Sequence, residues 1–187
     1  MQISPGSSEK QESPVRAGTV RPWREVFAEA RVTTLVSTWF GAGFLPIAPG
    51  TWGSLAAIPI AHLIVLLWGV WGLAGFALGV AIVGTHAAGE TARLRGVKDP
   101  SEVVVDEVAG QAIALIPVYA LVPAEAVVLR IGTVLLAFFL FRILDVWKPG
   151  PIGWLERLPG GFGIMADDLL GGAVAAAMVA GGLLLKG

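Results

Sequence analysis

Long apolar stretches separated by short polar connections dominate the pattern of this chain. Between Val32 and Gly89 there is no Asp, Glu, Lys or Arg. A membrane-spanning helix needs about 20 apolar residues, so this stretch is long enough to cross a bilayer more than once. The pattern predicts an integral membrane protein. The alternative is a soluble protein with unusually apolar buried helices.

The apolar stretches predict an all-α fold, a compact membrane-embedded bundle of about four to six helices. Glycine and proline mark the connections, for example at residues 69–72, where tryptophans suit a membrane interface. Pro59 is expected to kink its helix or to delay its start. The predicted helices cover residues 23–32, 55–68, 73–94, 103–122, 125–147 and 166–185.

The first 22 residues are polar and lack the apolar core of a signal peptide. They predict a flexible tail, followed by a single membrane domain over residues 23–187. The short helix predicted at 23–32 carries Arg24 and Arg31. It fits either an interfacial helix lying on the membrane or an ordinary solvated helix.

Composition supports the membrane interpretation and narrows the function. Hydrophobic residues make up 55% of the chain and charged residues only 14%, which is unusual for a soluble domain. The formal net charge of −1 gives no indication of nucleic-acid binding. The chain has no cysteine, which excludes a cysteinyl nucleophile, a thiolate metal site and disulfides.

Basic residues assign the two sides of the predicted bundle. They gather in alternate connections, whereas residues 69–72 and 122–125 contain no Lys or Arg. Connections rich in Lys and Arg remain in the cytoplasm, so the charged end is predicted to face it. The residues concerned are Arg93, Arg95, Lys98, Arg142, Lys148 and Arg157.

The acidic residues cluster at the same end, as the pairs Asp106-Glu107 and Asp167-Asp168 and as the single Asp145. Neighbours on a helix diverge by about 100°, so both members of a pair reach one centre only near a helix start, where both pairs are expected. Favourable interaction with the helix dipole is the alternative explanation. So many carboxylates repel one another unless a cation binds them, and oxygen ligands favour Mg²⁺.

Phosphate-binding groups are predicted beside these acids. Arg142, Asp145 and Lys148 share one helix face, which suits a phosphate next to a metal ion, although a structural ion pair is the alternative. The Gly/Pro-rich loop at 41–54 ends with Thr51 and Ser54, just before a predicted helix start. Free N–H groups and hydroxyls there fit an anion site, and a simple turn is the alternative.

Four segments, in this order, resemble the phosphatidylglycerophosphatase A family. The resemblance extends from about residue 40 to the C-terminus and leaves the polar tail outside. The segments are GAGFLPIAPGTWGSL (41–55), VVVDEVAG (103–110), FRILDVWKPGPI (141–152) and GGFGIMADDLLGG (160–172).

The resemblance implies a Mg²⁺-dependent lipid phosphatase of the bacterial inner membrane, with its active site on the cytoplasmic face. Its substrate would be phosphatidylglycerophosphate and its product phosphatidylglycerol. Combined with the chemistry above, it suggests metal binding by Asp106, Asp145, Asp167 and Asp168, with one or two ions. Glu107 or Asp145 would activate water. Arg142, Lys148, Thr51 and Ser54 would bind the phosphate.

Three other functions remain as alternatives. A phosphatase acting on another lipid phosphate, such as phosphatidic acid, would use similar chemistry. A small cation transporter would place acids near the middle of its membrane spans. A structural membrane subunit would have no need of so many acids in one place.

Overall fold

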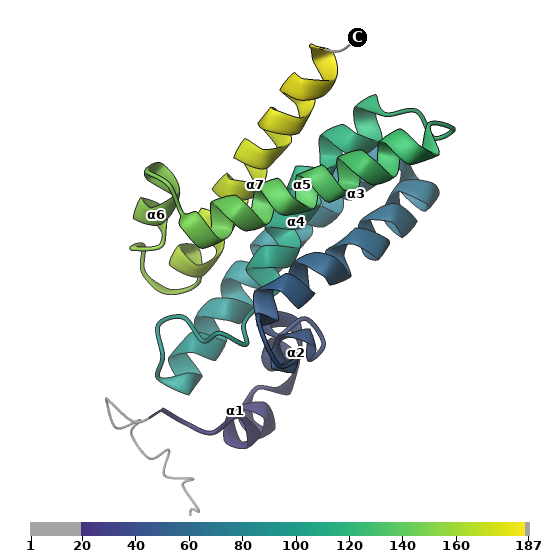
Figure 1. Ribbon diagram of the computed structural model, residues 1–187. Coiled ribbons are helices and arrows are strands. Elements are labelled where there is room, and N and C mark those ends of the chain that lie inside the picture. Colours follow the sequence, from purple (N-terminus) through teal and green to yellow (C-terminus); the bar gives the residue numbers. More distant parts are fainter. Residues whose placement is uncertain (1–19, 186–187) are drawn as a thin grey trace, which may run out of the picture.

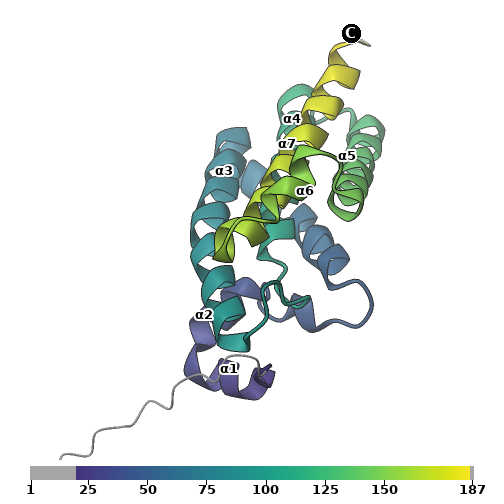
Figure 2. The same cartoon turned by 90° about the vertical axis from the view of Figure 1, so that its left-hand side faces the viewer.

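The computed structural model describes residues 20–185, and this range contains helices but no strand (Figures 1 and 2). The predicted all-α fold is confirmed. Most of the predicted N-terminal tail, residues 1–19, lies outside the described range. The elements are α1 (Trp23–Glu29), α2 (Arg31–Ser37), the 3-10 helix η1 (Ala42–Phe44), α3 (Pro49–Arg95), α4 (Val105–Leu121), α5 (Val127–Trp147), α6 (Pro151–Leu155) and α7 (Gly160–Leu184).

Helix α3 is a helical hairpin. Its 47 residues are interrupted at Gly69, which has φ 67° and ψ −171°, a conformation that glycine adopts readily. The chain reverses there, so the arms at 49–68 and 70–95 run in opposite directions (Figure 1). The predicted break at this position is confirmed.

The surface of the bundle supports the membrane interpretation. Helices α3, α5 and α7 are each long and apolar enough to cross a bilayer. Large apolar side chains on α3 and α5 point outward; Trp71 is 85% exposed and Val128 is 86% exposed. Apolar surface on this scale is unfavourable in water and favourable against lipid.

Helix α4 lies at the centre of the bundle, packed against α3, α5 and α7. Small residues along it are fully buried, among them Ala109, Ala112 and Ala114. Small side chains let neighbouring helices approach on several sides at once. Helix α4 is therefore held in place by three other helices.

Two glycine contacts fix α7 against its neighbours. A Cβ atom on Gly172 would overlap the carbonyl oxygen of Gly110 on α4, and one on Gly110 would lie 2.6 Å from the carbonyl oxygen of Asp168. On the other side of α7, a Cβ on Gly161 would overlap the carbonyl oxygen of Thr85 on α3. These helices touch backbone to backbone.

Several predicted helix boundaries were wrong. Helix α3 starts at Pro49, so residues 49–54 of the predicted loop are helical and Pro59 does not delay the start. Proline suits a first helical position because its missing N–H would have no partner there. Helix α7 starts at Gly160 instead of residue 166, and α6 was not predicted. The predicted helix at 23–32 is divided at Ala30 into α1 and α2.

The contact between α4 and α7 makes a testable prediction. We expect Gly172→Ala to lower the free energy of unfolding in detergent by about 1–3 kcal/mol, because the added methyl group meets rigid backbone. Gly181→Ala, in the same helix with no atom near its Cβ position, is the matched control and should be neutral or stabilising by up to about 1 kcal/mol. Equal stability of the two variants would contradict the close packing.

Candidate active site

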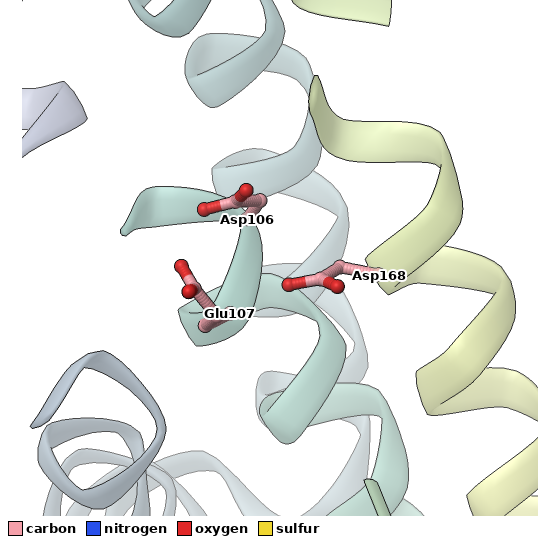
Figure 3. A group of neighbouring side chains, drawn as sticks. All are labelled: Asp106, Glu107 and Asp168. Carbon is pink, nitrogen blue, oxygen red and sulfur yellow. The ribbon is translucent and has the colours of Figure 1, made fainter. Parts of the chain in front are cut away.

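A group of three carboxylates forms where α4 and α7 meet. Asp106 and Glu107 lie in the first turn of α4, and Asp168 extends from α7 toward them (Figure 3). Each residue offers one carboxylate oxygen, and these three oxygens lie within 4.8 Å of one another. The turn before α4 is anchored by the Val104 N–H, which donates to the carbonyl oxygen of Ser37 at 2.9 Å.

The second acidic pair is divided between two partners. Because α7 starts at Gly160, Asp167 and Asp168 lie about two turns inside the helix, and the prediction that they open it was wrong. Their side chains therefore diverge. Asp168 joins Asp106 and Glu107, whereas Asp167 pairs with Lys148. The helix-dipole explanation does not apply to this pair, since that effect is confined to the first turn.

Asp106 and Asp168 are buried, Glu107 is partly buried, and all three carboxylates are incompletely paired among the described residues. Asp106 is 9% exposed and Asp168 only 2% exposed. Asp106 Oδ1, Glu107 Oε2 and Asp168 Oδ2 are buried without a hydrogen-bond partner. Buried polar atoms are almost always paired, and neighbouring like charges repel. Three oxygens free to bind one cation fit Mg²⁺, which prefers oxygen ligands.

Lys148 neutralises Asp167. Its ammonium group donates to Asp167 Oδ2 at 2.7 Å and lies 3.5 Å from Glu156 Oε2. Burial alone would lower the pKa of Lys148, but the hydrogen bond to Asp167 and the surrounding carboxylates outweigh it and raise this pKa. Lys148 therefore carries its positive charge throughout the physiological pH range.

Arg142 connects α5 to α3. Its guanidinium lies 2.6 Å from Asp145 Oδ2 and donates to the Ser54 hydroxyl at 3.5 Å. Asp145 in turn neighbours Asp168. The predicted row of Arg142, Asp145 and Lys148 therefore reaches the edge of the carboxylate group.

The first turn of α3 covers Glu107. A Cβ atom on Gly50 would overlap Glu107 Oε1 and lie 3.2 Å from the Arg142 guanidinium, so the two side-chain ends lie against the backbone of this turn. The fully buried Ser54 donates its hydroxyl to the carbonyl oxygen of Gly50 at 3.0 Å. Thr51 is partly exposed on the same turn. The predicted loop residues thus lie beside the acids, with Ser54 turned toward Arg142.

The predicted site residues therefore come together at one end of the bundle, but in three groups. Asp106, Glu107 and Asp168 form the carboxylate group, while Asp145 and Asp167 have cationic partners.

Sequence reasoning missed three buried residues near this site. Gly110 follows Asp106 by four positions and Gly172 follows Asp168 by four, so this shared spacing was a readable signal. Gln111, one turn after Glu107, is fully buried, and neither its amide nitrogen nor its amide oxygen has a hydrogen-bond partner. Gln111 could also have been found in the sequence, because it is a polar residue in an apolar helix and follows Glu107 by four positions.

Known proteins resemble this chain over most of its length. The family model described as Phosphatidylglycerophosphatase A matches residues 35–183. Phosphatidylglycerophosphatase A of Escherichia coli (strain K12) is 38% identical over 168 residues, covering 86% of this chain and 92% of the relative. The enzyme of the same name from Haemophilus influenzae is 37% identical over 146 residues, covering 78% of this chain and 85% of the relative.

A third relative carries a different description. A protein of Bacteroides thetaiotaomicron, described as a candidate phosphatidylinositol-3-phosphatase, is 36% identical over 150 residues, covering 78% of this chain and 90% of its own. No solved structure matches the chain significantly. The matches confirm the resemblance found in the sequence and the prediction that this protein is a phosphatase. The chain belongs to the phosphatidylglycerophosphatase A family.

Proposed function

We propose that this protein hydrolyses phosphatidylglycerophosphate to phosphatidylglycerol and inorganic phosphate. The observation that carries the proposal is the carboxylate group of Asp106, Glu107 and Asp168, each with a buried, unpaired oxygen, beside two cationic side chains. Removal of a phosphomonoester requires compensation of phosphate charge and a positioned water molecule, and these residues can supply both. The names of the relatives from Escherichia coli and Haemophilus influenzae support this choice of substrate.

Asp106, Glu107 and Asp168 would hold the Mg²⁺ ion. This set differs from the sequence prediction, which used Asp145 and Asp167 in place of Glu107. The geometry favours Glu107 because Asp145 and Asp167 already have cationic partners at 2.6 Å and 2.7 Å. When bound, Mg²⁺ would polarise the phosphoryl oxygens and offset their negative charge.

The remaining residues would orient the phosphate and the attacking water. Arg142 and Lys148 would face the phosphate oxygens, with the first turn of α3 at Thr51 supplying further donors. Asp145, beside Asp168 and held by Arg142, would accept the proton of the attacking water. The water oxygen bonds to phosphorus and the bond from phosphorus to the glycerol oxygen breaks. That oxygen takes up a proton from solvent water, and Asp145 returns the proton that it accepted to solvent.

Charge distribution supports a cytoplasmic active site in the bacterial inner membrane. Arg142 and Lys148 lie at the acidic end of the bundle. So do Arg93 and Arg95 in the last turn of α3 and Lys98 in the α3–α4 connection. At the opposite end, Arg130 on α5 is the one basic residue that the described helices and connections carry. By the preference of basic residues for the cytoplasm, the acid site faces inward. The acyl chains of the substrate would stay in the bilayer while its head group enters the site.

A second candidate is a phosphatase for another lipid phosphate. The description of the Bacteroides thetaiotaomicron relative motivates it, since a phosphoinositide also presents a phosphomonoester on a lipid head group. Family membership favours either phosphatase over a cation transporter or a structural subunit.

Substrate choice is tested by phosphate release from purified protein in mixed micelles. We expect the highest kcat/KM with phosphatidylglycerophosphate and lower values with phosphatidic acid and phosphatidylinositol 3-phosphate at equal surface concentration. A higher value for either of the other two lipids would replace the proposed substrate.

The metal assignment predicts dependence on a divalent cation. Chelation with EDTA should abolish phosphate release, and excess Mg²⁺ should restore it, because three adjacent carboxylates need a bound cation to accept an anionic substrate. Activity that is indifferent to chelation would exclude the proposed metal site.

The carboxylate group makes a prediction for single variants. We expect Asp106→Asn and Asp168→Asn each to lower kcat by more than about 100-fold, since residues that merely support metal ligands already contribute 10–100-fold. Glu90→Gln is the matched control, because Glu90 pairs with Arg93 on α3 and lies outside the group. Full turnover in either aspartate variant, with the control also active, would remove that residue from the site.

A further inference from the structure

A cavity of about 620 Å³ lies between α3, α4 and α5. This volume is within the range of small-molecule binding pockets. Its lining comes from the middle of the first arm of α3, from Tyr119 near the end of α4, from the α4–α5 connection and from the first half of α5, where Arg130, Ile131, Val134 and Leu135 contribute. None of them belongs to the acid site.

The lining changes from polar to apolar along α5. Arg130 lies in the first turn of this helix, near Tyr119 at the end of α4. Deeper along α5 the walls are formed by Ile131, Val134 and Leu135. This arrangement matches a molecule with a charged head and a hydrocarbon chain.

Arg130 lacks an anionic partner. Its guanidinium donates to the carbonyl oxygen of Val122 at 2.6 Å and lies 5.5 Å from the centre of the Tyr119 ring. Its Nε atom is buried without a hydrogen-bond partner. Between residues 20 and 185, no carboxylate forms an ion pair with Arg130. A cation against hydrocarbon is unfavourable unless an anion reaches it.

We propose that this cavity binds one anionic phospholipid, with its phosphodiester against Arg130 and an acyl chain along Ile131, Val134 and Leu135. An anionic head group would compensate the charge of Arg130, and the apolar walls fit a hydrocarbon chain, which a free anion lacks. Arg130 and Asp145 lie on the same helix, about 22 Å apart along its axis. The lipid site is therefore separate from the carboxylate group and does not depend on the proposed reaction.

Lipid binding to Arg130 variants tests the proposal. Native mass spectrometry of the detergent-solubilised protein would compare phosphatidylglycerol with phosphatidylcholine of the same acyl chains. We expect wild type and Arg130→Lys to bind one phosphatidylglycerol at least about fivefold more tightly than phosphatidylcholine, which corresponds to one basic residue near a lipid surface. Arg130→Gln should lose this preference. Arg24→Gln, which removes an exposed cation on α1, should keep it.

Photocrosslinking provides a second test that requires no variant. Wild-type protein would be reconstituted in nanodiscs containing either lipid with a diazirine at the end of one acyl chain. Adducts from phosphatidylglycerol should concentrate at residues 58–62 and 127–135, and adducts from phosphatidylcholine should not. Equal binding of the two lipids, an unchanged preference in Arg130→Gln, or adducts spread evenly over the apolar helices would each overturn the proposal. A native mass spectrum that shows a dimer without bound lipid would also overturn it, because a second copy would then cover the cavity.

Discussion

The backbone contact between Gly110 on α4 and Gly172 on α7 determines where the carboxylates meet. Asp106 and Asp168 each lie four positions before one of these glycines, hence one turn away on the same helix face. Because the helices touch without intervening side chains, the two carboxylates are near enough to share a ligand. Any side chain at the contact would separate the helices and, with them, the acids. The close packing of α4 against α7 therefore also sets the distance between the carboxylates of Asp106 and Asp168.

Charge balance then separates the acids into two roles. Arg142 neutralises Asp145 and Lys148 neutralises Asp167, each with an N–O distance below 3 Å. These pairs leave Asp106, Glu107 and Asp168 as the uncompensated acids of the site. Keeping several carboxylates ionised in a buried site is unfavourable without a counter-charge. Under the proposed function, a cation would bind to these three acids, and the paired residues would act on the phosphate and on water.

The sequence was sufficient for the class of fold and for the end of the bundle where the acidic residues gather. Apolar stretches and the break at Gly69 were readable because membrane helices have strong length and composition constraints. Helix starts at Pro49 and Gly160 were not, because glycine-rich segments have low helix propensity and tertiary packing overrides it here. The unforeseen start of α7 is also why the separation of Asp167 from Asp168 could not be predicted.

Helices α3 and α5 are connected at the acid end of the bundle and line the cavity toward its other end. Helix α5 has few buried residues, namely Thr133, Ala137, Phe138 and Phe141, so much of its length borders hydrocarbon. At the acid end, the Arg142 guanidinium on α5 donates a hydrogen bond to the Ser54 hydroxyl on α3. Toward the other end, residues of the same two helices line the cavity beside Arg130. Under the proposed function, a lipid head group would approach the acid end from the bilayer along α5, and the packed contacts between α4 and α7 would not need to open.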